Sequence, residues 1–469
     1  MNPSSLAFWG ASNNAMKMGT IQLTNVLETG FEGAVYPIHP SEETVLGLPA
    51  FKSVLDVGKP IDLAQLTLPT DVVPQVLEDC GKAGIRSVII ISGGFKEAPG
   101  DKGKQLERDI LEIAHKYDMH FLGPNCVGIF NSLRTFNSTT IPRPPMGGKI
   151  AFASQSGAYT AMINPYLRAN GIKMCQTISV GNEADIDLAD CLEYLADEPE
   201  VNAIGLYVET VRRPREFIRA ANAAVKKKPV VAVYVGGGEA GSRSSLSHTG
   251  ALSGPDQVYD GLFEQAGVIR ANDMDEMFDF LWAMSLAPLP SGRRMAVISN
   301  SGGPGTSLAY HLEKAGMSVP LFSEELVQQL KAVTGRLAYV GNPIDLTFEM
   351  DLFLFKKLVE LVFESGEVDG ALLYGIFGWQ DFMVNLEKRF PGIKKMQGAW
   401  EDAYFDFLDK MVAIPKEYGL PLFVMSFMGA SSPSISPLID GGVPAFQSAS
   451  RATRAMKAMC DYREIREGK

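Results

Sequence analysis

Pro229-Val-Val-Ala-Val-Tyr-Val235 runs directly into Gly236-Gly-Gly-Glu-Ala-Gly-Ser-Arg-Ser-Ser-Leu-Ser-His248-Thr-Gly-Ala-Leu-Ser-Gly254. The apolar first part predicts a strand buried on both faces, as in a parallel sheet. The loop that follows is rich in glycine and serine and leaves the carboxyl end of that strand, where open α/β sheets bind ligands. His248 is able to act there as a base, a ligand or a nucleophile. Taken alone, the loop is equally consistent with a surface loop that carries an incidental histidine.

Strands and helices alternate through the first 130 residues, which predicts a parallel, doubly wound sheet. The expected strands are Leu6–Gly10, Val35–Pro40, Leu63–Leu68, Ser87–Gly94 and His120–Cys126. The turn after the first strand contains Ser12, Asn13 and Asn14, and free backbone amides at this position would suit a phosphate. The turn is not a GxGxxG fingerprint, and many turns of this kind bind nothing.

Two later segments match each other in residue type at an offset of 145 residues. They are Lys149-Ile-Ala-Phe-Ala-Ser-Gln-Ser-Gly157 and Arg294-Met-Ala-Val-Ile-Ser-Asn-Ser-Gly302. Each is expected to form a strand, a Ser-Gly turn and a helix, so the chain contains two further domains of the same open α/β type. We expect a first domain over 1–130, a linker over 131–145, a second domain over 146–290 and a third over 291–469.

Composition limits the classes of function. The 469 residues include 46% apolar and 21% charged residues, which is ordinary for a globular protein of about three domains. A net charge of −11 disfavours binding to nucleic acid or to anionic membranes. Five scattered cysteines without a CxxC pair favour a reducing compartment and give no sign of a metal site. With no signal peptide and no apolar run long enough for a membrane helix, we expect a cytoplasmic protein.

The middle domain is predicted to gather three chemical groups at one edge of its sheet. Ser154-Gln-Ser-Gly-Ala158 begins a helix, so its backbone amides and the helix dipole form an anion site. Glu209 is the carboxyl end of the predicted buried strand Ala203–Glu209, and the His248 loop leaves a later strand of the same sheet. A histidine, a carboxylate that fixes its tautomer and an anion site together suit a nucleophile that carries a phosphoryl group. Simple helix capping and a solvated strand-end carboxylate are the alternatives.

These motifs carry a resemblance to a known family. The chain resembles the α subunits of NDP-forming acyl-CoA synthetases, the superfamily of succinyl-CoA synthetase and ADP-forming acetyl-CoA synthetase, over essentially its whole length. The matching motifs, in family order, are Gly123-Pro-Asn-Cys-Val-Gly128, Ser154-Gln-Ser-Gly157, Tyr207-Val-Glu209 and Ser247-His-Thr-Gly-Ala-Leu252. The resemblance implies an α/β fold with an N-terminal Rossmann-like CoA-binding domain and two flavodoxin-like parallel-sheet domains.

The resemblance also implies a reaction and its residues. Acyl-CoA and phosphate interconvert with CoA and acyl phosphate, whose phosphoryl group passes to His248 and then to ADP. Glu209 is implied to orient His248, and the phosphate-binding helix start falls on Ser156, Gly157 and Ala158. The family's CoA site falls on Gly10, Ala11, Ser12, Ile91, Ser92, Gly93, Asn125 and Cys126. This chain has Ala161 where succinyl-CoA synthetases place a substrate-side tyrosine, so the resemblance implies a small carboxylic acid but not succinate. Gly181-Asn-Glu-Ala-Asp185 replaces their Gly-Gly-Asp-Pro turn, so the resemblance does not identify the acyl pocket.

The sequence shows no nucleotide-binding machinery. It has no GxxxxGK[ST] motif and no stretch that resembles an ATP-grasp module. The resemblance therefore implies a separate ATP-grasp β subunit that holds ATP or ADP and Mg²⁺, in an αβ or α2β2 assembly. Two other functions stay open at this point. One is a CoA-binding regulatory relative without phosphotransfer, and the other is a nicotinamide-dependent oxidoreductase built on the N-terminal sheet.

Overall fold

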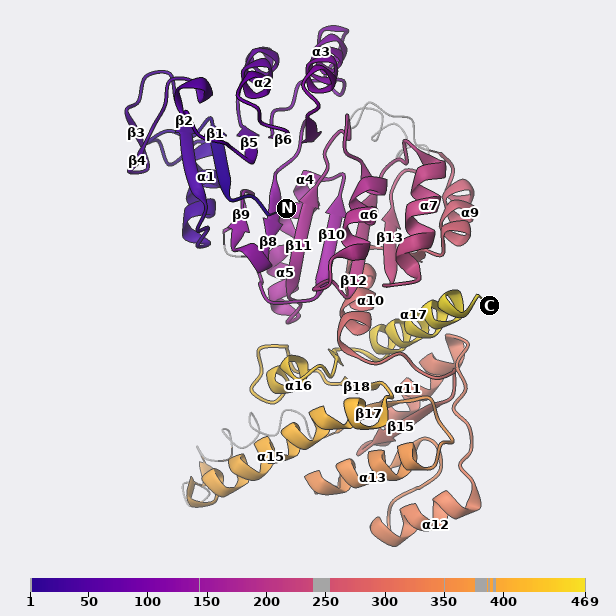
Figure 1. Cartoon of the computed structure of the whole chain (residues 1–469). Helices are drawn as coiled ribbons and strands as arrows, with labels where there is room; N and C mark the ends of the chain where they lie inside the picture. Colours follow the sequence, from indigo (N-terminus) through magenta and orange to yellow (C-terminus); the bar gives the residue numbers. More distant parts are fainter. Residues whose placement is uncertain are drawn as a thin grey trace. The chain divides into compact units, whose positions relative to one another are not determined.

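The computed structural model describes residues 2–142, 144–238, 254–349, 351–375, 386, 389–390 and 394–468. The chain divides into two compact units (Figure 1). The first comprises Met1–Arg168 and Lys173–Met277, and the second comprises Ala169–Ile172 and Phe278–Lys469. Each unit is built around mainly parallel strands, most of which are buried.

The N-terminal sheet of the first unit is wholly parallel and has the order β2-β1-β5-β6-β7. Its strands are β1 (Ser5–Trp9), β2 (Ala34–Ile38), β5 (Leu63–Leu66), β6 (Ser87–Ile90) and β7 (His120–Leu122). Its helices are α1 (Met18–Glu28), α2 (Val73–Lys82) and α3 (Lys102–Lys116). A small hairpin of β3 (Thr44–Val45) and β4 (Leu48–Pro49) follows β2, and short 3₁₀ turns lie at Val54–Asp56 and Thr70–Val72.

The middle sheet has the order β14-β13-β12-β10-β11-β8-β9. Five strands are parallel: β10 (Ile150–Ser154), β11 (Met174–Ser179), β12 (Ala203–Val208), β13 (Val230–Tyr234) and β14 (Ile269–Ala271). β8 (Ile129–Asn131) and β9 (Phe136–Asn137) extend the sheet in antiparallel pairing, joined by a 3₁₀ turn at Ser132–Arg134. Residues expected to act as a linker thus contribute strands to this sheet.

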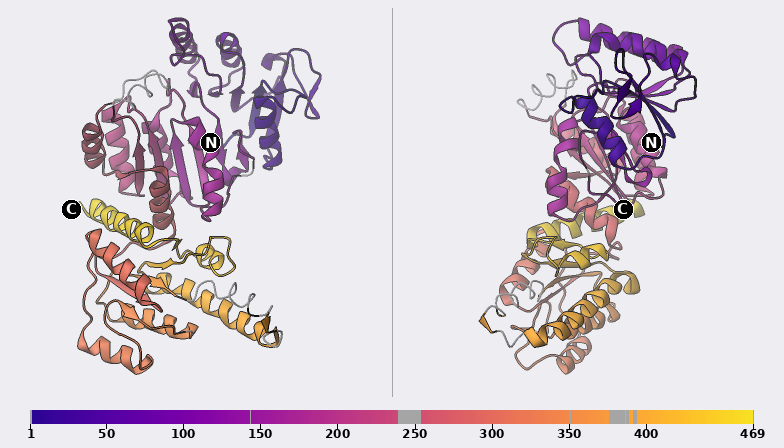
Figure 2. Two further views of the ribbon diagram at one scale, coloured as in Figure 1. Left: turned by 180° about the vertical axis from the view of Figure 1, so that it is seen from behind. Right: turned by 90° about the vertical axis from the view of Figure 1, so that its left-hand side faces the viewer.

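Six helices in the described part of the chain belong to the middle sheet, and two of them, α4 and α6, begin at a capping side chain. The six are α4 (Gly157–Met162), α5 (Asn164–Ala169), α6 (Leu188–Asp197), α7 (Pro214–Val225), α9 (Asp256–Ala266) and α10 (Met274–Leu286). Ser156 caps α4, and Asp187 caps α6 in a capping box with Asp190. α6 packs along α7, and α7 packs along α9 (Figures 1 and 2).

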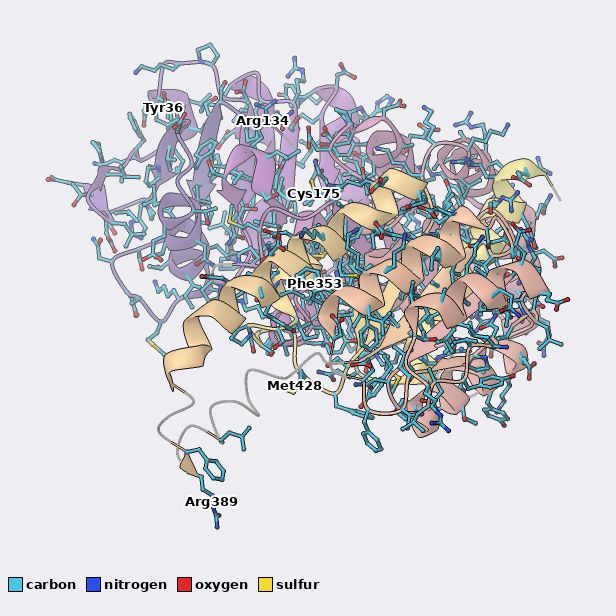
Figure 3. All side chains as sticks on the ribbon, turned by 90° about the horizontal axis from the view of Figure 1, so that it is seen from below. Tyr36, Arg134, Cys175, Phe353, Arg389 and Met428 are labelled. Atoms are coloured by element: carbon cyan, nitrogen blue, oxygen red, sulfur yellow. The ribbon has the colours of Figure 1, made fainter. Side chains whose placement is uncertain are left out.

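The second unit contains a third parallel sheet of order β16-β15-β17-β18-β19. The strands are β15 (Met295–Ser299), β16 (Ile344–Asp345), β17 (Gly370–Tyr374), β18 (Leu422–Met425) and β19 (Ala445–Phe446). The helices are α11 (Gly302–Lys314), α12 (Glu324–Val333), α13 (Leu352–Glu364), α15 (Lys394–Tyr418), α16 (Ser436–Asp440) and α17 (Ala449–Glu467). Phe353 of α13 meets Phe407 of α15 with 6.5 Å between ring centroids (Figure 3).

Counted along the chain, the parallel strands of all three sheets have the same order, 2-1-3-4-5, which is that of doubly wound folds. The repeat predicted from sequence is present: β10 and β15 begin at Ile150 and Met295, which are 145 residues apart. In such sheets the ligand site lies at the carboxyl ends of strands 1 and 3. The two strands are β1 and β5 in the N-terminal sheet, β10 and β12 in the middle sheet, and β15 and β17 in the third sheet.

Candidate active site

The carboxyl ends of β10 and β12 lie side by side, with Ser154 opposite Tyr207 in the parallel register. Chain connections leave these two strands on opposite sides of the sheet, which is the place where doubly wound folds bind ligands. The predicted anion turn begins directly after Ser154, and Glu209 comes directly after β12. The structure therefore brings these two parts of the predicted site to one edge of one sheet.

The side chain of Gln155 joins the anion turn (residues 154–158) to the backbone at Glu209. Its Oε1 accepts hydrogen bonds from the backbone amides of Glu209 (2.5 Å) and Thr210 (3.1 Å). Its Nε2 donates to the carbonyl oxygen of Thr210 at 2.7 Å and to Oε2 of Glu183 at 2.7 Å. A side chain of the anion turn thus holds the backbone that carries Glu209.

The predicted phosphate-binding residues begin α4. Ser156 is the N-cap, and its Oγ accepts the amide of Tyr159 at 3.3 Å. The Ser156 amide donates to Oγ of Ser154 at 3.1 Å. Gly157 and Ala158 occupy the first two helical positions, whose amides have no acceptor within a helix. These two amides are consequently the ones suited to an anion, while Ser156 sets the cap.

Glu209 is 5% exposed and lies close to the side chain of Tyr207, two residues earlier in the chain. Burial, and next the charge of Glu209, raise the pKa of Tyr207 well above its ordinary value. The Tyr207 ring also packs against Tyr159 of α4, with 4.7 Å between centroids. Glu209 therefore has a fixed position at the edge of the sheet, on a strand next to β13.

The predicted nucleophile His248 lies outside the described residues. The residues on either side of the undescribed stretch both belong to the carboxyl edge of the middle sheet. β13 pairs with β12 and ends at Tyr234. The chain is described as far as Gly238 and again from Gly254 onward. The amide of Val211, two residues after Glu209, donates to the hydroxyl of Tyr259 in α9 at 3.1 Å. The assignment of His248 to this edge stays a prediction.

Glu183 is a member of the site that sequence analysis did not single out. It is 2% exposed, and its Oε1 accepts the amide of Leu188 at 2.9 Å while Oε2 accepts from Gln155. Burial, and next the nearby Asp187, raise the pKa of Glu183 to about 8. The available signal is the turn Gly181–Asp185, which sequence analysis interprets only as a departure from the family pattern.

Glycine is required at the end of β1. Gly10 has a φ of +90°, and a Cβ atom there would lie 1.9 Å from the carbonyl oxygen of Thr67. The chain leaving β1 therefore passes directly over the chain leaving β5, with no space for a side chain. This contact places the predicted residues Gly10, Ala11 and Ser12 at the switch point of the N-terminal sheet.

The backbone amides expected to be free in this turn already have partners. Ser12 donates to Oγ1 of Thr20 at 3.1 Å, and Asn14 donates to Oγ of Ser12 at 3.3 Å. Asn13 donates to Oε2 of Glu42 at 3.2 Å, and its side-chain amide bonds to the same oxygen at 2.5 Å. The prediction of free amides was wrong, because acceptors on α1 and on the loop after β2 reach into the turn.

The other two stretches predicted to bind CoA, Ile91–Gly93 and Asn125–Cys126, contact each other. The carbonyl oxygen of Ser92 accepts the amide of Asn125 at 2.8 Å, and Oγ of Ser92 donates to the carbonyl oxygen of Leu68 at 2.6 Å. A Cβ atom on Gly93 would lie 3.1 Å from Oδ1 of Asn125. The Ile91 amide donates to the carbonyl oxygen of Leu66, so the stretches after β5, β6 and β7 form one continuous edge.

Cys126 lies beneath this edge. Its side chain is buried, and its thiol donates to the carbonyl oxygen of Ile90 at 3.3 Å. Burial raises the pKa of the Cys126 thiol to about 12, so it is a neutral thiol at physiological pH. Its contribution to a CoA site is therefore to shape the turn rather than to react.

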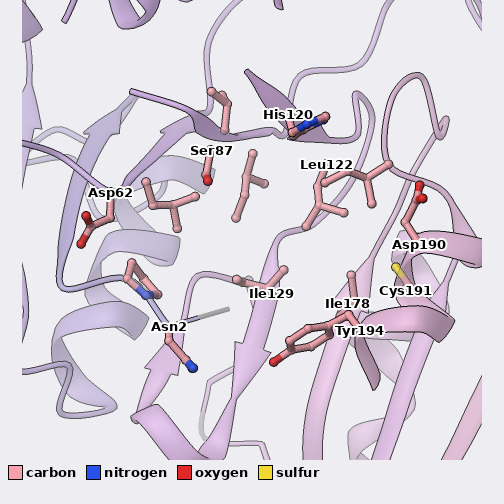
Figure 4. A pocket seen from close by; sticks show the side chains of 15 residues that line it. Asn2, Asp62, Ser87, His120, Leu122, Ile129, Ile178, Asp190, Cys191 and Tyr194 are labelled. Atoms are coloured by element: carbon pink, nitrogen blue, oxygen red, sulfur yellow. The ribbon is translucent and has the colours of Figure 1, made fainter. Parts of the chain in front are cut away.

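A cavity of about 370 Å³ lies at the opposite edge of the N-terminal sheet (Figure 4). Asp62, Ser87 and His120 line it from the amino ends of β5, β6 and β7, and Ile178 and Tyr194 of the middle sheet and α6 face them. Its lining does not include Gln155, Glu183 or Glu209, so this cavity is separate from the candidate site.

Two family models match the chain: a CoA binding domain over residues 4–132 and a succinyl-CoA ligase like flavodoxin domain over residues 147–284. The α subunit of the ADP-forming acetate–CoA ligase I of Pyrococcus furiosus is 33% identical over 471 residues, covering 98% of this chain and 96% of that one. The chain belongs to the family of ADP-forming acyl-CoA ligase α subunits. The α subunit of ligase II from the same organism is 40% identical over 368 residues, covering 78% of this chain and 80% of that one.

The fold agrees with a solved member of this family. The acetyl-coenzyme A synthetase 1 of Ca. Korarchaeum cryptofilum, in complex with phosphate and ADP, has a TM-score of 0.85 at 29% identity, covering 99% of this chain and 96% of that one. The predicted acid–thiol ligase class, CoA-binding domain and flavodoxin-like domain are confirmed, and the regulatory and oxidoreductase alternatives are not favoured. Within the described residues, no helix combines the length and the apolar character needed to cross a bilayer.

Proposed function

We propose that this α subunit passes a phosphoryl group from an acyl phosphate to His248. In the first step, an oxygen of phosphate attacks the thioester carbonyl carbon of acyl-CoA, the C–S bond breaks and the CoA thiolate leaves. In the second, an imidazole nitrogen of His248 attacks phosphorus, and the P–O bond to the acyl group breaks to release the carboxylate. An oxygen of ADP then takes the phosphoryl group from His248, and each step is reversible.

One observation carries this proposal most directly: the Gln155 side chain bonds both backbone amides that follow β12, so the anion turn and Glu209 share one edge. In the proposal, the amides of Gly157 and Ala158 hold the phosphate oxygens. The Glu209 carboxylate accepts the second ring N–H of His248, which fixes the tautomer and supports the positive charge that develops on the ring. Ser156 acts as the cap that keeps these amides turned outward.

CoA is proposed to bind the carboxyl edge of the N-terminal sheet. The close approach of the Thr67 backbone at Gly10, the close approach of the Asn125 side chain at Gly93 and the direct contact of Ser92 with Asn125 bring these stretches together at one edge, which supports a ligand that lies along it. The proposed contact residues are Gly10, Ala11, Ser12, Ile91, Ser92, Gly93, Asn125 and Cys126. We propose the domain boundaries stated above, 1–130, 146–290 and 291–469 with a linker over 131–145, as the units that carry these sites.

A partner supplies the nucleotide in this proposal. The Pyrococcus furiosus relatives are named as α subunits, which supports a β subunit, and we propose an ATP-grasp protein in an αβ or α2β2 assembly. ATP or ADP and Mg²⁺ would bind there, where the metal would neutralise phosphate charge. The acid is proposed to be small, acetate being the first to test. The five cysteines are free and buried in the structure, which suits a cytoplasmic enzyme.

Phosphate transfer from radiolabelled ATP tests the proposal on the assembled enzyme. Wild type should acquire an acid-labile, base-stable label on this subunit, and His248→Ala should not. His311→Ala, a histidine of α11, is the matched control and should label normally. A label that survives His248→Ala, or a wild type that takes none up while binding CoA, would overturn the proposal. The second result would favour a regulatory CoA-binding protein.

A further inference from the structure

The amide of Gln155 uses all of its hydrogen-bonding capacity. A glutamine side chain has two N–H donors and two acceptor lone pairs. Nε2 donates to the carbonyl oxygen of Thr210 and to Glu183, and Oε1 accepts the amides of Glu209 and Thr210. Gln155 is 3% exposed, so no water is needed to complete the set.

Only one orientation of this amide is compatible with its surroundings. If the amide were turned by 180°, its NH₂ group would face the two backbone N–H donors of Glu209 and Thr210. Oε2 of Glu183 accepts the hydrogen bond from Gln155 whether or not the Glu183 carboxyl carries a proton, and this contact holds the NH₂ group in the observed direction. Glu183 is itself fixed, because its second oxygen accepts the amide of Leu188 at the first residue of α6.

The turn that carries Glu183 is held from the side of the proposed CoA site. The Asn182 amide donates to the carbonyl oxygen of Pro124 at 2.9 Å, and its side-chain Nδ2 donates to Oε2 of Glu97 at 2.6 Å. Its Oδ1 accepts from Nδ2 of Asn125 at 3.3 Å. Glu183 has a φ of +53°, a conformation uncommon for this residue type that these contacts maintain.

We propose that Glu183 is a positioning residue that orients the Gln155 amide and so sets the separation between the anion turn and Glu209. The inference rests on the proposed function, because the group so positioned is the one expected to orient His248. Glu183 touches neither substrate nor His248 in this proposal. It acts through Gln155, and its neighbour Asn182 connects the same turn to the proposed CoA site.

Three variants test the donor and acceptor pattern. In Glu183→Gln, the new NH₂ group faces either the NH₂ group of Gln155 or the backbone amide of Leu188, so in one of these contacts two donors face each other. In Gln155→Glu, the carboxyl groups of residues 155 and 183 face each other and the N–H donor between them is lost. The double variant Glu183→Gln/Gln155→Glu restores the contact with donor and acceptor exchanged, while the acceptors for the Glu209 and Thr210 amides remain. Its one mismatch is at the Thr210 carbonyl oxygen, where a carboxylate oxygen replaces the N–H donor, so we expect partial rather than full recovery.

The readout is the rate of labelling from radiolabelled ATP in the assembled enzyme, measured by rapid quench. We expect each single variant to label at least tenfold more slowly than wild type, and the double variant to label faster than either. CoA affinity, measured by calorimetry, should change less than twofold in all three. Glu193→Gln makes the same chemical change on α6 at an exposed side chain, where Arg219 is its partner, and should label as wild type does.

Several outcomes would overturn the inference. A Glu183→Gln enzyme that labels at the wild-type rate, or a folded double variant no faster than the singles, would show that the amide orientation does not set the rate. Should Glu183→Gln not fold, the double variant carries the test. Loss of folding in both would assign Glu183 to folding alone. A wild-type enzyme without label would instead refute the proposed function, so the two failures are distinct.

Discussion

The hydroxyl of Tyr234, the last residue of β13, donates a hydrogen bond of 2.6 Å to the carbonyl oxygen of Gly254. Gly254 is the first described residue after the stretch that contains His248. The Tyr234 ring also stacks on Tyr259 of α9 with 3.6 Å between centroids. Tyr234 and Gly254, which lie on either side of the proposed phosphohistidine segment, are therefore hydrogen-bonded to each other beside the sheet that holds Glu209.

Tyr234→Phe should remove the hydrogen bond to Gly254 and keep the ring stacking on Tyr259. The variant loses one hydrogen bond, so we expect the free energy of unfolding to fall by about 1 kcal/mol. Labelling of His248 should slow several-fold, because the segment returns to the sheet at a less defined point. Urea denaturation and rapid-quench labelling measure the two effects. Unchanged labelling in a variant that shows the stability loss would mean that the Gly254 anchor has no part in phosphoryl transfer.

Alanine substitution at two glycines with the same φ distinguishes the cost of backbone strain from the cost of a steric clash. Gly10 and Gly30 both have a φ of +90°, but a Cβ atom at Gly30 would have no atom within 4 Å. Gly30→Ala should therefore cost only about 1 kcal/mol, from the unfavourable φ. Gly10→Ala adds a clash with the backbone at Thr67, so we expect a clearly larger loss of stability and weaker CoA binding. Thermal unfolding and calorimetry are the measurements, and equal losses in the two variants would contradict the packing role of Gly10.

Glu42 places a negative charge in the turn where CoA phosphates are expected. Its carboxylate bonds to both the backbone and side-chain N–H groups of Asn13. Glu42→Gln removes the charge, so CoA should bind about three- to tenfold more tightly at low salt, corresponding to about 1 kcal/mol of Coulomb energy near a surface. The gain should shrink as salt is added. Glu43→Gln, exposed and adjacent, is the control, and a Glu42→Gln enzyme with unchanged affinity would place the CoA phosphates elsewhere.

The sheets could be predicted from sequence because their strands are short apolar runs that end in glycine- or serine-rich turns. Ile150–Ser154 and Ala203–Val208 are wholly buried and were recognisable for that reason. The position of Glu209 beside the anion turn also followed, since the carboxyl ends of parallel strands share one edge. Residues directly after a buried strand are thus the part of the site that a single sequence specifies best.

Contacts between distant residues could not be predicted in the same way. Glu42 and Asn13 are 29 positions apart, and Glu183 and Gln155 are 28 apart. No periodicity connects either pair. The strands β8 and β9 were also missed, because Ile129–Asn131 and Phe136–Asn137 are too short to show an alternating pattern. The pairing of β8 with β11, and of β9 with β8, becomes visible only once the middle sheet exists.

Glu183 should make the stability of the first unit depend on pH. Burial and the nearby Asp187 raise its pKa from 4.5 to about 8, so between these values the folded chain keeps a proton that the unfolded chain has released. Stability contributed by this proton is present below about pH 4.5 and is lost as pH rises toward 8. Glu183→Gln cannot titrate, so its Tm should fall less than that of wild type between pH 5 and pH 8. Calorimetric scans measure the slopes, with Glu193→Gln expected to match wild type. Parallel slopes for Glu183→Gln and wild type would show that the Glu183 carboxyl does not hold this proton.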